Sequence, residues 1–69
     1  MTNNKSVIAE NIKKYRKKKG ISQDKLSKLA DITYNTIIKI ESGVTYNPRV
    51  DTLKQIANAL GVGIDDLMK

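Results

Sequence analysis

The positively charged side chains of this sequence are concentrated in one short run. Residues 13–19 (KKYRKKK) place six cations in seven positions. Residues 1–35 carry nine basic and three acidic groups, a net charge of +6, whereas residues 36–69 carry four of each sign. A cationic run of this density indicates a polyanionic partner, either nucleic acid or an anionic membrane surface, or else a solvated helix face. The charge alone does not choose between them.

Much of the chemistry of enzymes is excluded by residues that the composition lacks. There is no His and no Cys, which removes the commonest general base, a thiol nucleophile, a zinc thiolate site and any disulfide. The adjacent Asp65 and Asp66 suit the first turn of a helix better than an acid/base pair. Gly61 and Gly63 do not follow a strand, as the glycines of a dinucleotide-binding loop do. We therefore expect no enzyme activity, no cofactor and no metal, and no small-molecule ligand is evident.

The length predicts one small domain that spans residues 1–69. A chain of this size buries only roughly 60% of its unfolded surface, which leaves no room for a deep substrate pocket. No apolar run approaches the roughly 20 residues that a membrane helix needs. The first five residues are not followed by the apolar stretch of a signal peptide. A cytoplasmic protein with no membrane partner is the expectation.

Apolar residues recur three and four positions apart along the chain, which is the period of an α-helix. The stripes are Ile8-Ile12-Tyr15, Leu26-Leu29-Ala30, Ile37-Ile40, Val50-Leu53-Ile56-Ala57-Leu60 and Ile64-Leu67-Met68. No segment alternates apolar and polar residues as a half-buried strand does. The pattern predicts an all-α fold with helices near 6–19, 23–30, 34–42, 49–60 and 64–69.

Residues suited to helix ends lie between these stripes. Ser22 and Thr33 have the side-chain oxygens that cap a helix N-terminus. Asp31 tolerates the left-handed conformation better than most residues other than glycine. Three glycines are placed to end helices in that conformation, namely Gly20, Gly43 and Gly61.

The helices predicted at 23–30 and 34–42 are separated by only three residues. Two short helices joined so tightly must cross steeply, as in a helix-turn-helix unit. The apolar positions that this crossing needs are all present: Leu26, Ala30, Ile32, Ile37 and Ile40.

Several segments of the chain resemble the phage-repressor and Cro-like (lambda-repressor-like) family of helix-turn-helix DNA-binding domains. The resemblance is carried by residues 20–26 (GISQDKL) and 37–43 (IIKIESG), and it continues from Asn47 to Leu67. It implies a compact five-helix domain that binds operator DNA as a dimer.

The sequence departs from the family pattern at four positions. Ser27 replaces a usual Ala where the helices approach closely, but its hydroxyl can bond back to a carbonyl one turn earlier. Asp31 replaces a usual Gly in the turn. Arg49 and Gly63 stand where a capping Ser or Thr is typical, which affects only the starts of the last two helices.

The resemblance also implies which side chains meet DNA. In a helix-turn-helix the second helix enters the major groove, where Asn pairs with adenine and Lys with guanine. The expected base contacts are Thr33, Tyr34, Asn35, Thr36 and Lys39. The expected phosphate contacts are Arg16, Gln23, Ser42, Tyr46, Asn47 and Arg49. Arg16 is also expected to form a structural ion pair with Glu41, and most of the lysine run is expected to raise solubility and steer encounter.

The predicted function is a sequence-specific double-stranded DNA-binding transcriptional regulator, a repressor that binds a palindromic operator as a homodimer. It would be a bacterial or phage-type, nucleoid-associated protein. The dimer interface is expected at Val62, Ile64 and Met68, and the alternative is that these residues only cap the core. The alternative function is a protein-binding antitoxin or inhibitor module on the same fold. A membrane-surface helix is disfavoured, because the chain has neither Trp nor Phe.

Overall fold

The computed structural model describes residues 7–45 and 47–69. These residues form five α-helices and no strand, so the predicted all-α five-helix fold is confirmed. The helices are α1 (Val7–Lys19), α2 (Gln23–Ala30), α3 (Tyr34–Glu41), α4 (Val50–Leu60) and α5 (Ile64–Met68). The predicted starts and ends agree within one residue wherever they fall on described residues, because Ser42, Arg49 and Lys69 are caps rather than helical residues.

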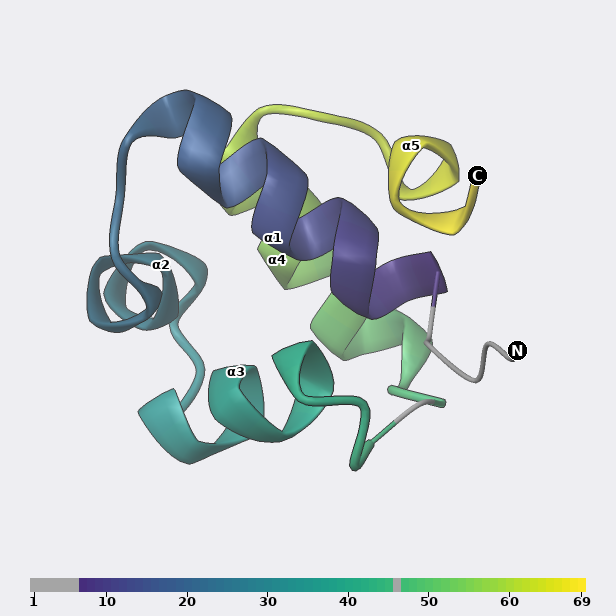
Figure 1. Cartoon of the computed structure of the whole chain (residues 1–69), viewed down its shortest axis with the longest axis horizontal. Helices are drawn as coiled ribbons and strands as arrows, with labels where there is room; N and C mark the ends of the chain where they lie inside the picture. Colours follow the sequence, from purple (N-terminus) through teal and green to yellow (C-terminus); the bar gives the residue numbers. More distant parts are fainter. Residues whose placement is uncertain (1–6, 46) are drawn as a thin grey trace.

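The first helix packs against α3, α4 and α5. In Figure 1 α1 crosses in front of α4, with α3 on one side of it and α5 near its N-terminal end. The side-chain amide of Asn11 in α1 donates to the carbonyl of Leu67 in α5 at 2.8 Å. In the helix-turn-helix pair, α2 packs against α4 and α3 packs against α1.

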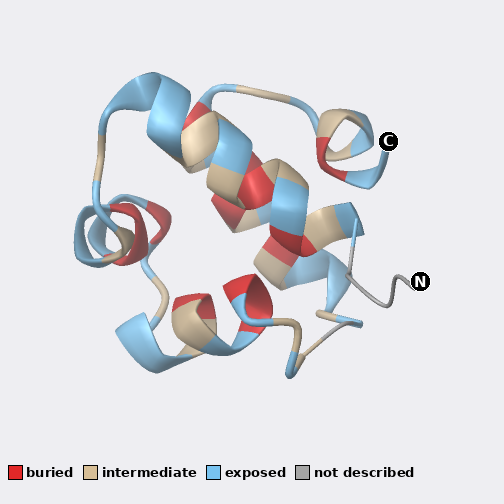
Figure 2. Ribbon diagram, viewed as in Figure 1, coloured by how far each residue is buried: buried red, intermediate tan, exposed pale blue. Residues whose placement is uncertain are grey.

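One apolar core receives a side chain from every helix, and Figure 2 shows buried residues on all five helices. The large side chains that are less than 2% exposed are Ile12, Leu26, Ile37, Ile40, Ile56 and Leu67. Each such side chain stabilises the fold by roughly 1.5–3 kcal/mol through removal of apolar surface from water. Of the five residues predicted for the crossing, four are buried and Ile32 is partly buried against the core.

Three residues of the predicted apolar stripes do not reach the core, namely Leu29, Val50 and Met68. Leu29 is 49% exposed, because the buried face of α2 is formed by Leu26, Ser27 and Ala30. Ser27 takes the inward position, and its hydroxyl donates to the carbonyl of Asp24 at 2.7 Å, the expected bond back along the helix. Val50 is 64% exposed at the first position of α4.

The predicted caps of α2 and α3 are present. The Ser22 hydroxyl accepts from the backbone N–H of Lys25 at 3.0 Å, and the Thr33 hydroxyl accepts from the N–H of Thr36 at 3.2 Å. Asp31 ends α2 in the left-handed conformation, with φ 60° and ψ 44°. These local features fix the directions in which the chain leaves α2 and enters α3.

The turn between α2 and α3 is also held from outside. The Gln55 amide of α4 donates to the carbonyl oxygens of Ala30 at 3.1 Å and Asp31 at 3.4 Å. These carbonyls lie at the end of α2, where helical partners run out. The position of α4 therefore helps to set the angle between α2 and α3.

The two atypical caps take different forms. Arg49 is the N-cap of α4 and makes no side-chain cap bond. At α5, the backbone N–H of Gly63 donates to the carboxylate of Asp66 at 3.0 Å. This bond is the half of a capping box that runs from the N-cap backbone to the side chain of the third helical residue, and the Asp66 carboxylate also suits the helix dipole.

Candidate nucleic-acid interface

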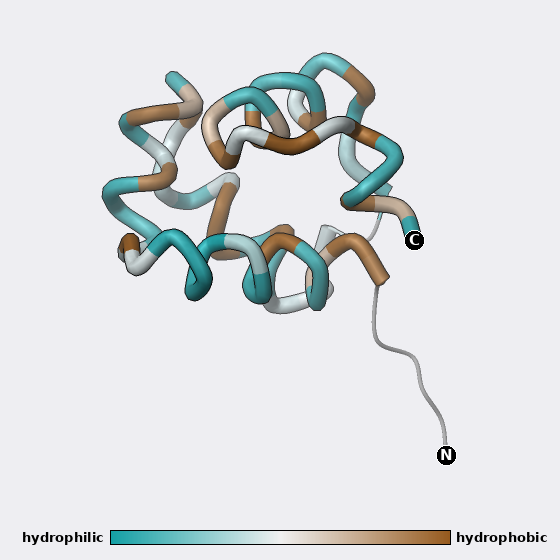
Figure 3. The backbone as a smooth tube through the Cα atoms, turned by 90° about the horizontal axis from the view of Figure 1, so that it is seen from above, coloured by the Kyte–Doolittle hydropathy of each residue, from teal (hydrophilic) through white to brown (hydrophobic). Residues whose placement is uncertain are grey.

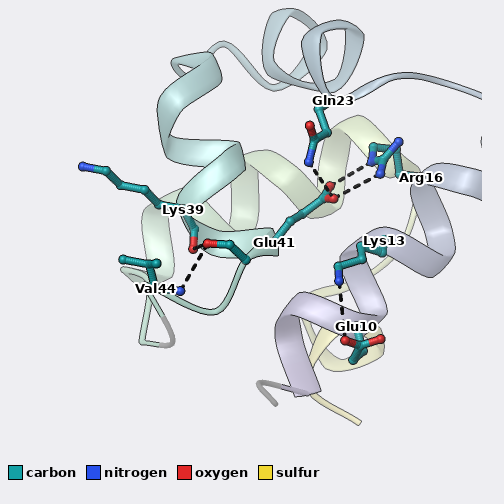
Figure 4. Close-up of polar contacts among 8 residues, drawn as sticks. Glu10, Lys13, Arg16, Gln23, Lys39, Glu41 and Val44 are labelled. Carbon is teal, nitrogen blue, oxygen red and sulfur yellow. Dashed lines mark hydrogen bonds and ion pairs between the residues drawn. The ribbon is translucent and has the colours of Figure 1, made fainter. Parts of the chain in front are cut away.

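The side of α3 that faces away from the core carries polar side chains. Tyr34, Asn35 and Lys39 are exposed, Tyr34 by 47%, whereas Ile37 and Ile40 on the opposite side are at most 1% exposed. Asn35 and Lys39 are four residues apart and therefore neighbours on the helix surface. In Figure 4 the Lys39 side chain extends away from the body of the protein. We call Tyr34, Asn35 and Lys39 the outer row of α3.

The two threonines at the start of α3 bond to each other. Their Oγ1 atoms lie 2.7 Å apart, and Thr33 also caps the helix. Thr33 is exposed and Thr36 is half-buried. Ile38 is half-buried as well, beside the outer row. Contacts of Thr33 and Thr36 with bases stay a prediction.

A buried ion pair ties α3 to α1. Arg16 Nε donates to Glu41 Oε2 at 2.8 Å, and Arg16 Nη2 donates to Glu41 Oε1 at 3.1 Å. The Glu41 side chain is only 3% exposed and the Arg16 side chain 14% exposed. The two parallel bonds form the fork geometry in which an Arg–carboxylate pair is strongest. This is the pair that the family resemblance implied.

The same carboxylate also holds α2. Gln23 Nε2, at the first position of α2, donates to Glu41 Oε1 at 3.1 Å (Figure 4). Arg16 Nη1 donates to the carbonyl of Ile21 at 3.0 Å, just before α2 begins. Three helices thus meet at one carboxylate, and the first turn of α2 is fixed relative to α3. The phosphate contacts expected of Arg16 and Gln23 stay predictions.

The remaining expected phosphate contacts follow the C-terminal end of α3. The Ser42 hydroxyl donates to the carbonyl of Lys39 at 3.0 Å and accepts from the N–H of Val44 at 3.4 Å. Asn47 and Arg49 are exposed in the segment that leads to α4. Tyr46 lies outside the described residues.

The expected dimer residues occupy different environments. Val62 and Ile64 are half-buried and pack against the core, whereas Met68 is 56% exposed. Of the three, Met68 offers the largest free apolar surface. Their role in a dimer stays a prediction.

Besides the bond from Gln23 to Glu41, sequence reasoning missed two features of the structure. One is the amide of Gln55, which holds the turn between α2 and α3 and gives no signal in the sequence pattern. The other concerns Lys14 and Lys18, whose ammonium groups lie 5.5 and 6.0 Å from the centroid of the Tyr15 ring. The sequence did contain a signal for this contact, because one lysine precedes Tyr15 directly and another follows it three positions later.

Within the part of the chain that the structure describes, no three or more carboxylates gather in a way that could hold a metal ion. No helix in those same residues has the length and hydropathy to cross a membrane.

Two short helices that cross through a capped three-residue turn, the second with a polar outer row, define a helix-turn-helix domain. The helix-turn-helix family model matches residues 12–67, and the chain belongs to this family. The resemblance to lambda-repressor-like domains is thereby confirmed.

The chain is also similar to named proteins of this class. It is 31% identical over 62 residues to the HTH-type transcriptional regulator SinR of Bacillus subtilis (strain 168), an alignment that covers 90% of this chain and 56% of that protein. It is 36% identical over 61 residues to the HTH-type transcriptional regulator SlrR of the same strain, covering 88% of this chain and 40% of that protein. The chain therefore spans about half the length of these curated relatives.

A solved structure agrees with the fold over nearly the whole chain. The N-terminal DNA binding domain of SinR from Bacillus subtilis superposes with a TM-score of 0.90 at 29% sequence identity, and 94% of each chain is covered. The likeness extends to all five helices of the present chain.

Proposed function

We propose that this chain is a DNA-binding domain of a transcriptional regulator and not an enzyme. The family match and the two relatives named as HTH-type transcriptional regulators support this function. The observation that carries it is the outer row of α3, a set of exposed hydrogen-bonding side chains on a helix whose other side is locked into the core.

In the proposed complex, α3 lies in the major groove of double-stranded DNA and the first turn of α2 meets the phosphate backbone. Asn35 bridges the N6 and N7 atoms of an adenine, and Lys39 reaches the O6 and N7 atoms of a guanine. Tyr34 contacts a phosphate or a base edge, and the methyl groups of Thr33 and Thr36 meet thymine methyl groups. The capped start of α3 supports this role because it fixes the helix end that enters the groove.

Phosphate contacts are assigned to Gln23 and to the segment that follows α3. The bond from Gln23 to Glu41 uses one amide hydrogen, so the second hydrogen can donate to a phosphate. Backbone N–H groups in the first turn of α2 favour an anion at the same place. Ser42, Tyr46, Asn47 and Arg49 supply the second contact region.

We further propose that the protein acts as a homodimer on a palindromic operator and represses transcription. One helix-turn-helix reads only a few base pairs, and two-fold partners would place half-sites about one helical turn apart. Met68, together with Val62 and Ile64, is the proposed contact between subunits. Sedimentation at micromolar concentration, with and without a palindromic duplex, tests the dimer. A complex of one chain per palindrome would contradict it.

The main test is Asn35→Ala. A duplex selected from random DNA should bind this variant about 1–3 kcal/mol more weakly, because a bidentate base contact is lost. A scrambled duplex should lose little. Fluorescence anisotropy at one salt concentration measures both affinities.

Gln23→Ala is the matched control for this test. It removes a phosphate contact, so it should weaken binding to the selected and the scrambled duplex alike. If Asn35→Ala also left the ratio of the two affinities unchanged, α3 would not read bases through Asn35.

A further inference from the structure

The lysines of α1 fall on two sides of the helix. Arg16 points to α3, where its guanidinium meets Glu41. Two positions along an α-helix rotate a side chain by roughly 200°. Lys14 and Lys18 each lie two positions from Arg16, so both project from the side of α1 opposite to α3.

Lys17 extends this surface. It lies about 100° around the helix from Arg16 and next to Lys18 along the chain, and all three lysines are exposed. In Figure 3 the outward turns of α1, along the lower edge of the view, are hydrophilic. We call Lys14, Lys17 and Lys18 the α1 ridge.

The ammonium groups of two ridge lysines are gathered around one aromatic ring. Lys14 Nζ lies 5.5 Å and Lys18 Nζ 6.0 Å from the centroid of the Tyr15 ring. Tyr15 is itself half-buried against the core, which keeps the ring in place. Each ammonium group is attracted to the same ring, and the two positive charges raise the potential over this part of α1.

Within the residues that the structure describes, no ion pair neutralises this ridge. Among residues 7–45 and 47–69, the ion pairs of α1 join Lys13 to Glu10 at 3.6 Å and Arg16 to Glu41 at 2.8 Å. No carboxylate of those residues pairs with Lys14, Lys17 or Lys18. In the complex proposed above, the duplex lies against α3, and Lys14 and Lys18 are on the opposite side of α1.

We propose that the α1 ridge is a docking surface for an acidic segment of a partner protein, and that it remains accessible while α3 holds DNA. Charge complementarity is the basis for this choice of partner. The spacing of Lys14 and Lys18, four residues or about 6 Å along the helix axis, matches carboxylates four residues apart on a partner helix. The part of the proposal that concerns bound DNA rests on the function proposed above.

The test uses a fluorescein-labelled peptide with pairs of glutamates four residues apart as the acidic probe. Binding is followed by anisotropy, first on the free chain and then on the chain saturated with its selected duplex. We expect the probe to bind in both states. The variant Lys14→Gln/Lys17→Gln/Lys18→Gln should bind it roughly tenfold more weakly, because three exposed ion pairs are lost together.

The matched control is Lys25→Gln/Lys28→Gln/Lys54→Gln, which removes the same charge from α2 and α4. Circular dichroism melting curves check that both variants fold, as expected for exposed helical positions changed to Gln. We expect the control to bind the probe within about twofold of the parent chain.

Three results would overturn the proposal. Equal losses in the two triple variants would show a response to net charge alone. Displacement of the probe by the duplex would place the probe on α3. Sedimentation of one chain with two duplexes, lost in the ridge variant, would assign the ridge to a second DNA. Failure of the chain to bind any duplex would refute the proposed function. Binding of the acidic probe to the parent chain and the two triple variants, measured without DNA, would still test the ridge.

Discussion

The outer row of α3 and the α1 ridge both expose polar groups, but they are built differently. The outer row mixes a phenol, an amide and one ammonium group on a helix with a capped start and a fully buried inner side. The ridge consists of three ammonium groups on the solvent side of the central helix. Varied donors and acceptors suit the reading of base edges, whereas repeated cations suit a long-range field. The ridge therefore carries more positive charge than the outer row, although the outer row is the surface suited to sequence-specific DNA recognition.

The largest expected effect is on the free energy of unfolding. It concerns the ion pair between Arg16 of α1 and Glu41 of α3. Arg16→Met leaves the Glu41 carboxylate buried without its partner, so the free energy of unfolding should fall by about 3–5 kcal/mol. A chain of this length has a total stability of roughly 3–10 kcal/mol, so much of the population would unfold. Urea unfolding followed by circular dichroism measures the change.

The double variant Arg16→Met/Glu41→Leu is the control for this prediction. It removes both charges and should regain most of the lost stability, because no charge is left buried alone. If Arg16→Met lowered the free energy of unfolding by less than about 1 kcal/mol, the ion pair would not be what holds α1 and α3 together.

An effect of intermediate size is expected from the loss of the helix caps at Ser22 and Thr33. Thr33→Ala and Ser22→Ala should each lower the free energy of unfolding by about 1 kcal/mol, since each removes one side-chain cap bond. Only Thr33→Ala should also reduce the preference for the selected duplex, because it loosens the turn that carries Tyr34 and Asn35. Chemical unfolding and anisotropy on two duplexes provide the measurements. Equal changes in preference would argue against a special role for the start of α3.

The smallest expected effect is on the salt dependence of DNA binding. Each cation that neutralises a phosphate contributes about 0.9 to the slope of log affinity against log salt. Arg49→Ala should lower the slope by about that amount, whereas Lys18→Ala should leave it unchanged. A titration of each variant from low to moderate salt gives both slopes. A reduced slope for Lys18→Ala would bring the ridge into contact with the same duplex.

Features set by local chemistry were predictable from the sequence. Ser22 and Thr33 cap their helices and Asp31 turns left-handed, because each outcome depends on one side chain and its own backbone. The resemblance in segments 20–26 and 37–43 supplied the topology. It also supplied the pairing of residues 16 and 41, which the spacing alone does not give.

Features that depend on distant segments were not predictable. Leu29 falls in an apolar stripe, yet the neighbouring helices reach only the other side of α2, and Ser27 takes the inward place. The bond from Gln23 to Glu41 and those from Gln55 to the end of α2 join residues 18 to 25 positions apart. An amide on a polar face gives no sign of its partner. The positions of the base and phosphate contacts likewise depend on a DNA duplex and stay predictions.

The hold of Gln55 on the end of α2 has a consequence for protein engineering. The α2–α3 unit takes part of its geometry from a residue on α4, so residues 20–43 alone are not a portable module. Grafted onto another scaffold, they would need a donor amide opposite the carbonyls of Ala30 and Asp31. An exchange of recognition specificity between related domains is therefore better made by changing the outward side chains of α3 than by moving the two helices as a block.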